Sequence, residues 1–291
     1  MTSPARRMPE VRDIELPLSG EQPASLLPMN LSVGLLATAS LWHRELVRFY
    51  RQRSRVLGVI GSPLVFWWLV GSGLGDSFRA GDHGAGYLQY FFPGTMLLIV
   101  IFTSVFCMMS VIEDRHAGFL QSVLASPAPR AALVLGKVLG GTTLAAVQGV
   151  ILLPLAPLVG IPLTPARVLG LVAFLFLLAF GLTAFGFLLA WVVDSTHGFH
   201  AIVNLIFIPM WLVSGALFPM SGASPWVAWL MRVNPLTYGT AGVQRLLFLR
   251  EPLAAPSFSL ALGMTLLFSL LAFLAALTVV HRRSRGSGLV S

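Results

Sequence analysis

Residues 206–219 read Ile206-Phe207-Ile208-Pro209-Met210-Trp211-Leu212-Val213-Ser214-Gly215-Ala216-Leu217-Phe218-Pro219. They belong to a longer stretch, Phe199 to Leu247, which begins as a membrane span and continues as Pro225-Trp226-Val227-Ala228-Trp229-Leu230 and Asn234-Pro235-Leu236-Thr237-Tyr238. A soluble loop would not contain so much Trp, Leu and Pro, and a second full span would not be broken so often. Irregular backbone at membrane depth persists only where protein or a water-filled cavity satisfies its polar groups. The stretch is therefore predicted to re-enter the bilayer and to line a transport path.

The overall composition indicates a protein that lies in lipid. Of the 291 residues, 56% are hydrophobic and 10% are charged, and the mean hydropathy is +0.83, whereas about 25% of the residues of a soluble domain are charged. The net charge of +8 would fit a nucleic-acid partner only if the basic residues clustered on a solvated domain, and here they flank apolar runs. We expect an all-α polytopic membrane protein with no nucleic-acid partner.

Six segments meet the length of about 20 apolar residues that a span needs. They are Val56–Leu74, Phe91–Ile112, Val138–Val159, Val168–Val193, Phe199–Phe218 and Phe258–Val280, with re-entrant outer helices between the fifth and the sixth. Cytoplasmic loops are enriched in Lys and Arg, and 14 of the 19 Lys and Arg residues lie before the first span, between the second and third, or after the sixth. Both termini are therefore predicted to be cytoplasmic, and the broken stretch to face outward.

The chain divides into four predicted parts. Residues 1–30 lack the apolar core of a signal peptide and are expected to form a disordered cytoplasmic tail. Residues 31–55 predict an amphipathic helix in the membrane interface, or alternatively a plain charged anchor for the first span. Residues 56–280 hold the six-span domain and residues 281–291 a basic cytoplasmic tail. The helix at 31–55 would present Leu35, Ala39, Trp42, Leu46 and Phe49 on its apolar face and His43, Arg44, Arg48 and Arg51 on the opposite face.

Motifs for catalysis and for cofactor or metal binding are missing from the sequence. Gly136-Lys137-Val138 is the nearest approach to a phosphate-binding loop, but that motif needs Gly at Ala131 and Ser or Thr at Val138. His197 and His200 lie one turn apart without a third ligand, so an interfacial role is preferred to a metal site. The single Cys107 lies in an apolar run, where it is expected to pack, and it excludes a disulfide framework. We expect no catalytic, cofactor or metal site in this chain.

Ionisable residues are also missing from the predicted spans. With Lys137 left outside the third span, the six segments contain no Asp, Glu, Lys or Arg. Ion-coupled carriers and proton pumps rely on such residues. An intramembrane hydrolase would need a basic partner for Ser104, Ser110 or Ser214, and none is evident. The energy for transport is therefore predicted to come from elsewhere.

The loop from Glu113 to Lys137 carries a second informative pattern. It opens with Glu113-Asp114-Arg115-His116-Ala117-Gly118 and continues with Ser126-Pro127-Ala128-Pro129-Arg130. Because Pro disfavours helical geometry in the residue before it, Ser126 to Pro129 should interrupt the helix, and a new helix should start at Arg130. A short helix held between two spans is a natural docking element for a soluble partner, and an ordinary loop with solvated charges is the alternative.

Several short motifs, taken in order, resemble the ABC-2 type exporter permeases over roughly Leu41 to Val280. Their order and spacing together are more specific than any one of them, and His116 stands where this family often has an acidic residue. The motifs are Tyr90-Phe91-Phe92-Pro93-Gly94, Glu113-Asp114-Arg115 with Gly118, Ser126-Pro127 with Arg130 and Gly136-Lys137, Ser214-Gly215-Ala216-Leu217-Phe218-Pro219, and Asn234-Pro235-Leu236-Thr237-Tyr238.

This resemblance implies a permease subunit of the inner (plasma) membrane without its own ATP site. Its partners would be two ATP-binding cassette subunits, which hold ATP and Mg²⁺, and a second permease copy that is identical or a close paralogue, all within membrane lipid. It further implies an outer gate from Trp226 to Tyr238 and coupling of the ATPase through Arg115, His116, Gly118 and Arg130.

The path itself is expected to involve polar and aromatic residues of the spans and the broken stretch. Gln148 and Asn204 are uncharged polar residues of the spans that either face the path or, as we favour, bond across helices. The leading hypothesis is export of an amphiphile, such as a drug-like metabolite or a lipid, and the alternative is export of a polysaccharide or lipid-linked saccharide. The candidates for path and gate are Gln148, Asn204, Trp211, Ser214, Gly215, Phe218, Asn234 and Tyr238.

Overall fold

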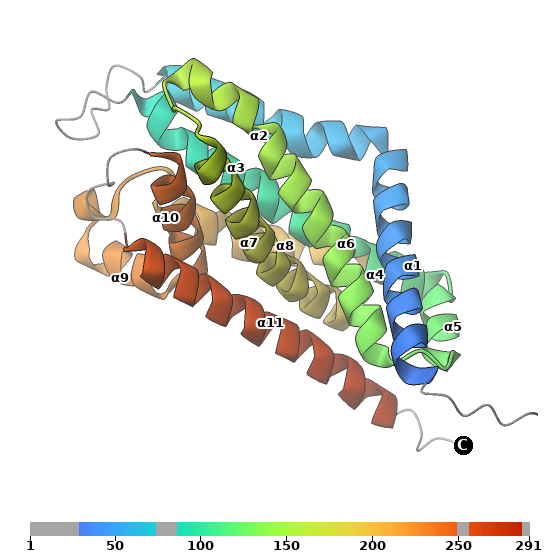
Figure 1. Ribbon diagram of the computed structural model, residues 1–291. Helices are drawn as coiled ribbons and strands as arrows, with labels where there is room; N and C mark the ends of the chain where they lie inside the picture. Colours follow the sequence, from blue (N-terminus) through green and yellow to red (C-terminus); the bar gives the residue numbers. More distant parts are fainter. Residues whose placement is uncertain (1–28, 74–85, 249–255, 287–291) are drawn as a thin grey trace, which may run out of the picture.

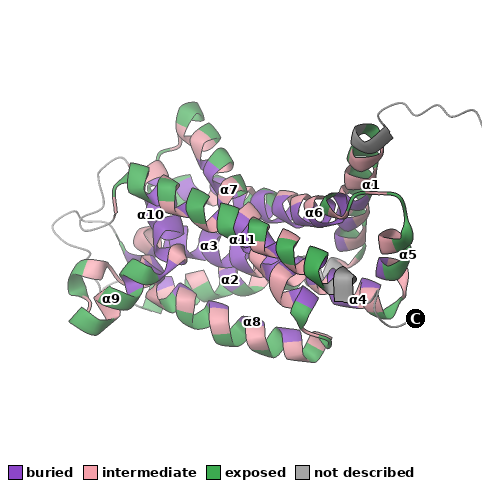
Figure 2. Cartoon of the chain, turned by 90° about the horizontal axis from the view of Figure 1, so that it is seen from below, coloured by how far each residue is buried: buried purple, intermediate pink, exposed green. Residues whose placement is uncertain are grey.

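The structure is a computed structural model that describes residues 29–73, 86–248 and 256–286, and every regular element in these ranges is helical. The helices form an elongated bundle (Figure 1). At one end, the α5 end, lie α5 and the last turns of α11, and at the opposite end, the α9 end, lie α9 and α10 (Figures 1 and 2). The elements are α1 (Met29–Arg51), α2 (Arg53–Gly73), α3 (Tyr87–Cys107), α4 (Met109–His116), α5 (Phe119–Ala125), α6 (Arg130–Ile151), η2 (Leu153–Val159), α7 (Pro165–Val192), α8 (Thr196–Trp211), η3 (Leu212–Ala216), η4 (Met220–Gly222), α9 (Pro225–Val233), α10 (Pro235–Leu247) and α11 (Phe258–Gly286).

Five helical stretches of the described residues are long and apolar enough to cross a membrane. They are Tyr87–His116, Arg130–Leu155, Pro165–Val192, Thr196–Ala216 and Phe258–Arg282. The all-helical membrane class is thus confirmed. The predicted first span corresponds to α2, whose apolar part, Leu57–Gly73, is shorter than the other five. The sixth span and the re-entrant character of α9 and α10 stay predictions, and most of the predicted amino-terminal tail lies outside the described residues.

The predicted interruption before the third span is confirmed. Helix α5 ends at Ala125, and α6 begins at Arg130, directly after Pro129, which has extended backbone angles. The third helix therefore starts eight residues before the predicted boundary at Val138 and includes Lys137. Because Lys137 is fully buried, the expectation of spans without charged residues is wrong for this helix.

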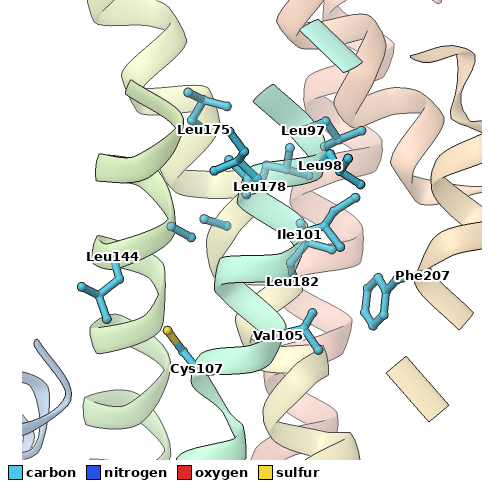
Figure 3. Packing of buried hydrophobic residues seen from close by; sticks show 14 of the residues in the cluster. Leu97, Leu98, Ile101, Val105, Cys107, Leu144, Leu175, Leu178, Leu182 and Phe207 are labelled. Carbon is cyan, nitrogen blue, oxygen red and sulfur yellow. The ribbon is translucent and has the colours of Figure 1, made fainter. Parts of the chain in front are cut away.

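Helix α3 lies at the centre of the bundle. In the most apolar part of the stretch Tyr87–His116, which α3 and α4 form together, 83% of the residues are buried. The corresponding share is 33% in Thr196–Ala216 and 28% in Phe258–Arg282. Figure 3 shows how the core is built, with Ile101 and Val105 of α3 facing the leucines of α7 and with Phe207 of α8 closing one side. Cys107, at the end of α3, packs in this core as predicted. The outer helices α8 and α11 expose large apolar faces, which can contact lipid or another chain.

The predicted amphipathic helix is present as α1, but its ends and faces differ from the expectation. It stops at Arg51, and the chain then turns sharply into α2 (Figure 1). Leu35, expected on the apolar face toward the membrane, is 66% exposed on the protein, which is compatible with contact to lipid, whereas Arg44 and Arg48, expected on the opposite polar face, bond to α4. The polar face of α1 is therefore not simply solvated, because it packs against α4 and α6, which carry charged partners for it. The position of α1 in the membrane interface stays a prediction.

Candidate functional site

The α5 end of the bundle is built around a tight reversal between α4 and α5. Gly118 takes the left-handed conformation, with φ of 73°, which costs any residue with a Cβ atom about 1–2 kcal/mol. Its amide donates to the carbonyl oxygen of Arg115 at 3.1 Å, and Ala117 donates to Glu113 at 2.9 Å. These bonds end α4, and α5 then runs back with Leu120 buried beneath it. The predicted short helix is therefore present, and its exposed residues include Gln121, Ser122 and Ala125. Its role in docking stays a prediction.

Arg115 joins this hairpin to the end of α7. Its guanidinium donates to the carbonyl oxygens of Ala190 at 3.0 Å, Trp191 at 2.8 Å and Val193 at 3.2 Å, and to the carboxylate of Asp194 at 2.8 Å. The last carbonyl groups of a helix have no partner within the helix and carry its negative dipole end, so a cation satisfies both needs. Arg115 thus caps α7 and fixes α4 against the turn between α7 and α8.

The other predicted coupling residues surround the same region. The Nε2 atom of His116 lies 2.9 Å from the carbonyl oxygen of Asp194, next to the Arg115 bonds. Arg130 is the first residue of α6 and is half buried. The structure therefore brings Arg115, His116 and Gly118 together within one hairpin, with Arg130 at the start of the next helix. Their contact with an ATPase stays a prediction.

Six charged residues form a cluster where α1, α4 and α6 meet. We call it the ion cluster. Asp114 lies at its centre and accepts two bonds from Arg44, at 2.7 and 2.8 Å, and one from Arg48, at 2.9 Å. Lys137 donates to Glu45 at 2.5 Å and also to Asp114. The members are Arg44, Glu45, Arg48, Glu113, Asp114 and Lys137, with three charges of each sign.

Exposure falls from the outside of the ion cluster to its inside. Arg44 is 36% exposed, while Lys137 is 0% and Glu45 is 4% exposed. The hydrogen bonds that Arg44 donates to Asp114 raise the pKa of the Arg44 guanidinium above its ordinary value, in spite of partial burial. The Arg44 guanidinium also lies 3.7 Å from the centre of the Phe119 ring, so the cluster reaches the first residue of α5. The sequence analysis missed this cluster, because Arg44 and Arg48 were assigned to the polar face of a helix, Glu113, Asp114 and Lys137 to a loop, and Glu45 was given no role.

At the α9 end, the fifth span is broken where the sequence predicted irregular backbone. Helix α8 changes into η3, in which Val213 has non-helical angles and Gly215 has φ of 84°. Tyr90 donates to the carbonyl oxygen of Gly215 at 2.9 Å. Asn234 donates to the carbonyl oxygen of Met210 at 2.6 Å and accepts from the amide of Leu236 at 3.0 Å. The side chain of Asn234 therefore gives a carbonyl group near the end of α8 a hydrogen-bond donor, and it also caps the start of α10.

The predicted path residues do not all meet at this break. Trp211 donates to the carbonyl oxygen of Gly94 at 2.9 Å, and the buried Ser214 accepts from Thr240 at 3.2 Å. These two residues, with Gly215 and Asn234, form one group that holds η3 against α3 and α10. Phe218 is half buried just beyond η3, and Tyr238 donates to the carbonyl oxygen of Arg232 at 2.7 Å.

Gln148 and Asn204 lie apart from that group. Gln148 is buried and accepts a hydrogen bond from Thr103, so the favoured bond across helices is found for this residue. Asn204 is exposed on α8, on a helix that also exposes His197 and His200. Among the described residues no group of three or more His, Cys, Asp or Glu side chains is arranged to hold a metal ion.

Comparisons with known proteins agree with this architecture. Residues 37–248 match the family described as ABC-2 type transporter. The chain is 27% identical over 198 residues to a transport permease of Cyanophora paradoxa, ycf38, covering 67% of this chain and 68% of the relative. It is 23% identical over 214 residues to the inner membrane transport permease YadH of Escherichia coli K12, covering 71% of this chain and 81% of the relative.

Proposed function

The chain belongs to the ABC-2 type transporter family, and on this premise we propose that it exports an amphiphilic substrate, in a complex with two separate ATP-binding subunits and a second permease copy. Membership makes the chain the membrane transport permease of an ABC transporter, a subunit that is not itself the ATPase. The direction of transport, the substrate class and the numbers of subunits are the parts that we propose.

The observation that carries the proposal is the position of the α4–α5 hairpin. It stands at the end of the bundle opposite the break in α8, and it is tied to α1 by the ion cluster and to α7 by Arg115. A soluble ATPase that contacts α5 would therefore act on three helices at once. Rigid-body motion transmitted in this way is a known means of switching a protein between two states.

The orientation that we propose places the α5 end in the cytoplasm. Among the described residues, the helix ends and loops at the α5 end carry most of the Lys and Arg residues, as cytoplasmic segments do. The relative YadH is an inner membrane permease, and we propose the same membrane here, with both termini cytoplasmic.

The exposed face of α8 supports an amphiphilic substrate and a second permease copy. This face combines polar residues, such as Asn204, with apolar residues, such as Leu205, which is 75% exposed. A polar side chain that faces lipid is costly, so a face of this kind suits a path shared between two copies. A lipid or a drug-like metabolite would offer matching polar and apolar parts.

Reconstitution of the complex provides the test. The permease is co-expressed with a candidate ATP-binding subunit from the same organism, purified and placed in vesicles, and ATP hydrolysis is measured with fluorescent lipids, amphiphilic dyes or lipid-linked saccharides. We expect an ATP-binding subunit to co-purify and an amphiphile to stimulate hydrolysis. Stimulation by saccharides alone would favour the polysaccharide alternative. Transport that persists after the ATP site of the partner is disabled would contradict the proposal.

A further inference from the structure

We propose that the buried ion pair between Lys137 and Glu45 is a positioning element that fixes α1 on α6, so that a movement of the α5 end reaches the α9 end of the bundle. The inference rests on the proposed function, since it concerns the transmission of motion from an ATPase. The two residues are buried where α1 and α6 meet, so they would act through the packing of helices.

The surroundings of Lys137 satisfy every hydrogen of its ammonium group. An ammonium has three donors, and its three acceptors here are Glu45 of α1 at 2.5 Å, Ser110 of α4 at 3.0 Å, and Asp114 of α4. The side chain is 0% exposed. Lys137 therefore links α6 to two other helices through bonds with fixed directions.

The backbones of α1 and α6 lie in direct contact around this ion pair. A Cβ atom at Gly136 would lie 2.8 Å from the Cβ atom of Leu41, and one at Gly140 would lie 2.7 Å from the Cβ atom of Glu45. These distances leave no room for a larger residue. The glycines thus set the separation of the two helices, while the ion pair sets how far one can slide along the other.

Glu45 depends on Lys137 more than Asp114 does. In the described part of the chain, Asp114 pairs with Arg44, Arg48 and Lys137, whereas Glu45 pairs with Lys137 alone. Loss of Lys137 would therefore leave Asp114 paired with two arginines but would leave the buried carboxylate of Glu45 without its ion-pair partner. This asymmetry makes the inner pair separable from the rest of the ion cluster by substitution.

Stability alone does not account for a buried ion pair at this contact. Apolar side chains of similar volume often replace buried ion pairs without loss of stability, because charges are costly to take out of water. An ion pair has a fixed direction, so Lys137 and Glu45 hold α1 and α6 in a single register, whereas apolar side chains would allow several. Helix α6 runs along the bundle beside α3 and α7 (Figure 1), so a fixed register carries a shift of α1 into the core.

The test uses a reporter at the α9 end that needs no substrate. Met231 is 1% exposed and packs 3.7 Å from the position of a Cβ atom at Gly215. Cys107, the single native cysteine, is replaced by Ala, and Met231→Cys is introduced. In the complex with its ATP-binding subunits, the rate of reaction with a membrane-impermeant maleimide is measured with and without Mg²⁺, ATP and vanadate. We expect ATP to change this rate by at least about fivefold, the lower bound of typical allosteric coupling.

The decisive variant is Lys137→Met combined with Glu45→Met in that background. We expect the double variant to assemble with the ATP-binding subunits and to unfold at the parent temperature, but to lose the ATP-dependent change in labelling. Retention of the full change would overturn the inference and leave the pair a packing feature. If the labelling rate of the parent complex is the same with and without ATP, the result would contradict the proposed function instead.

Two further variants serve as a control and as an alternative to the double variant. Trp42→Phe removes the bond of 3.1 Å from the Trp42 indole to Thr143 in the same contact between α1 and α6, and it should leave the ATP-dependent change intact. A loss in Trp42→Phe equal to that in the double variant would overturn a specific role for the ion pair. Glu45→Gln keeps the size of the side chain and serves if the double variant fails to fold. A weaker ATP response at an unchanged unfolding temperature supports the inference, and an unchanged response overturns it.

Discussion

Arg115, near the end of α4, donates a hydrogen bond to the carboxylate of Asp194, beyond the end of α7, at 2.8 Å. The two partners differ in environment, since Arg115 is 21% exposed and Asp194 is 77% exposed. The ion pair is therefore the outer and weaker part of the contact, and the bonds from Arg115 to the carbonyl groups of α7 are the inner part.

We expect Arg115→Ala to lower the free energy of unfolding by about 2 kcal/mol, since hydrogen bonds to charged groups contribute roughly 1.5–3 kcal/mol. Asp194→Ala, the control, removes only the exposed partner, and exposed ion pairs contribute about 0–1 kcal/mol. Thermal unfolding of the purified permease in detergent measures both. Equal losses in the two variants would show that the carbonyl bonds of Arg115 contribute nothing.

Gly118→Ala should disturb the hairpin at the α5 end without filling any space. No atom lies within 4 Å of the position of its Cβ atom, so the cost arises from φ of 73° alone, at about 1–2 kcal/mol. Gly160 is a matched control at the far side of α6, with φ of 77° and equally open surroundings. We expect similar losses of stability in both variants but weaker co-purification of the ATP-binding subunit only for Gly118→Ala. Equal co-purification would remove the hairpin from the docking site.

Gln148→Met tests whether Gln148 bonds across helices or lines the path. Its partner is Thr103, and such bonds in membrane proteins average about 0.6 kcal/mol, with a maximum near 1.7 kcal/mol. We expect a loss of stability within that range and unchanged substrate-stimulated ATP hydrolysis. A double-mutant cycle with Thr103→Val measures the bond. Altered substrate preference in Gln148→Met would instead make it a path residue.

Asn234 offers a sharper test of the α9 end. Asn234→Ala removes a helix cap, a change that costs about 0.5–2 kcal/mol. It also removes the side-chain donor to the carbonyl oxygen of Met210. Asn234→Asp keeps the cap but faces a carboxylate toward the carbonyl oxygens of Met210 and Val213, to which the amide donates at 2.6 and 3.3 Å. We therefore expect Asn234→Asp to be less stable than Asn234→Ala, as measured by thermal unfolding. The opposite order would mean that capping of α10 is the main role of the side chain.

The sequence was sufficient for features that depend on neighbours along the chain. Pro127 and Pro129 predicted the break before α6, and the Ser214-Gly215 region predicted the interruption of the fifth span. Both effects are local, because Pro and Gly act on the backbone of their own and adjacent residues.

Features that depend on distant partners could not be predicted in this way. Lys137 was treated as the edge of a span because a hydropathy window gives a charge the same cost wherever it lies. Its carboxylate partners Glu45 and Asp114 lie 92 and 23 residues away along the chain. Likewise, the carbonyl groups that Arg115 caps lie 75 or more residues away. The pairing of these groups becomes visible only once the helices are packed.

The position of Lys137 along the chain bears on how the protein enters the membrane during synthesis. An isolated Lys within a membrane helix is costly to insert, by up to about 2.5–3.5 kcal/mol at the helix centre and less toward its ends. Glu45 and Asp114 both precede Lys137, and a chain emerges from the ribosome amino terminus first. When α6 leaves the translocon, the carboxylates that neutralise its ammonium have therefore already been made. Because Glu45 and Asp114 are synthesised before Lys137, the ammonium group can form its salt bridges as α6 inserts. It then does not face lipid as an unpaired charge.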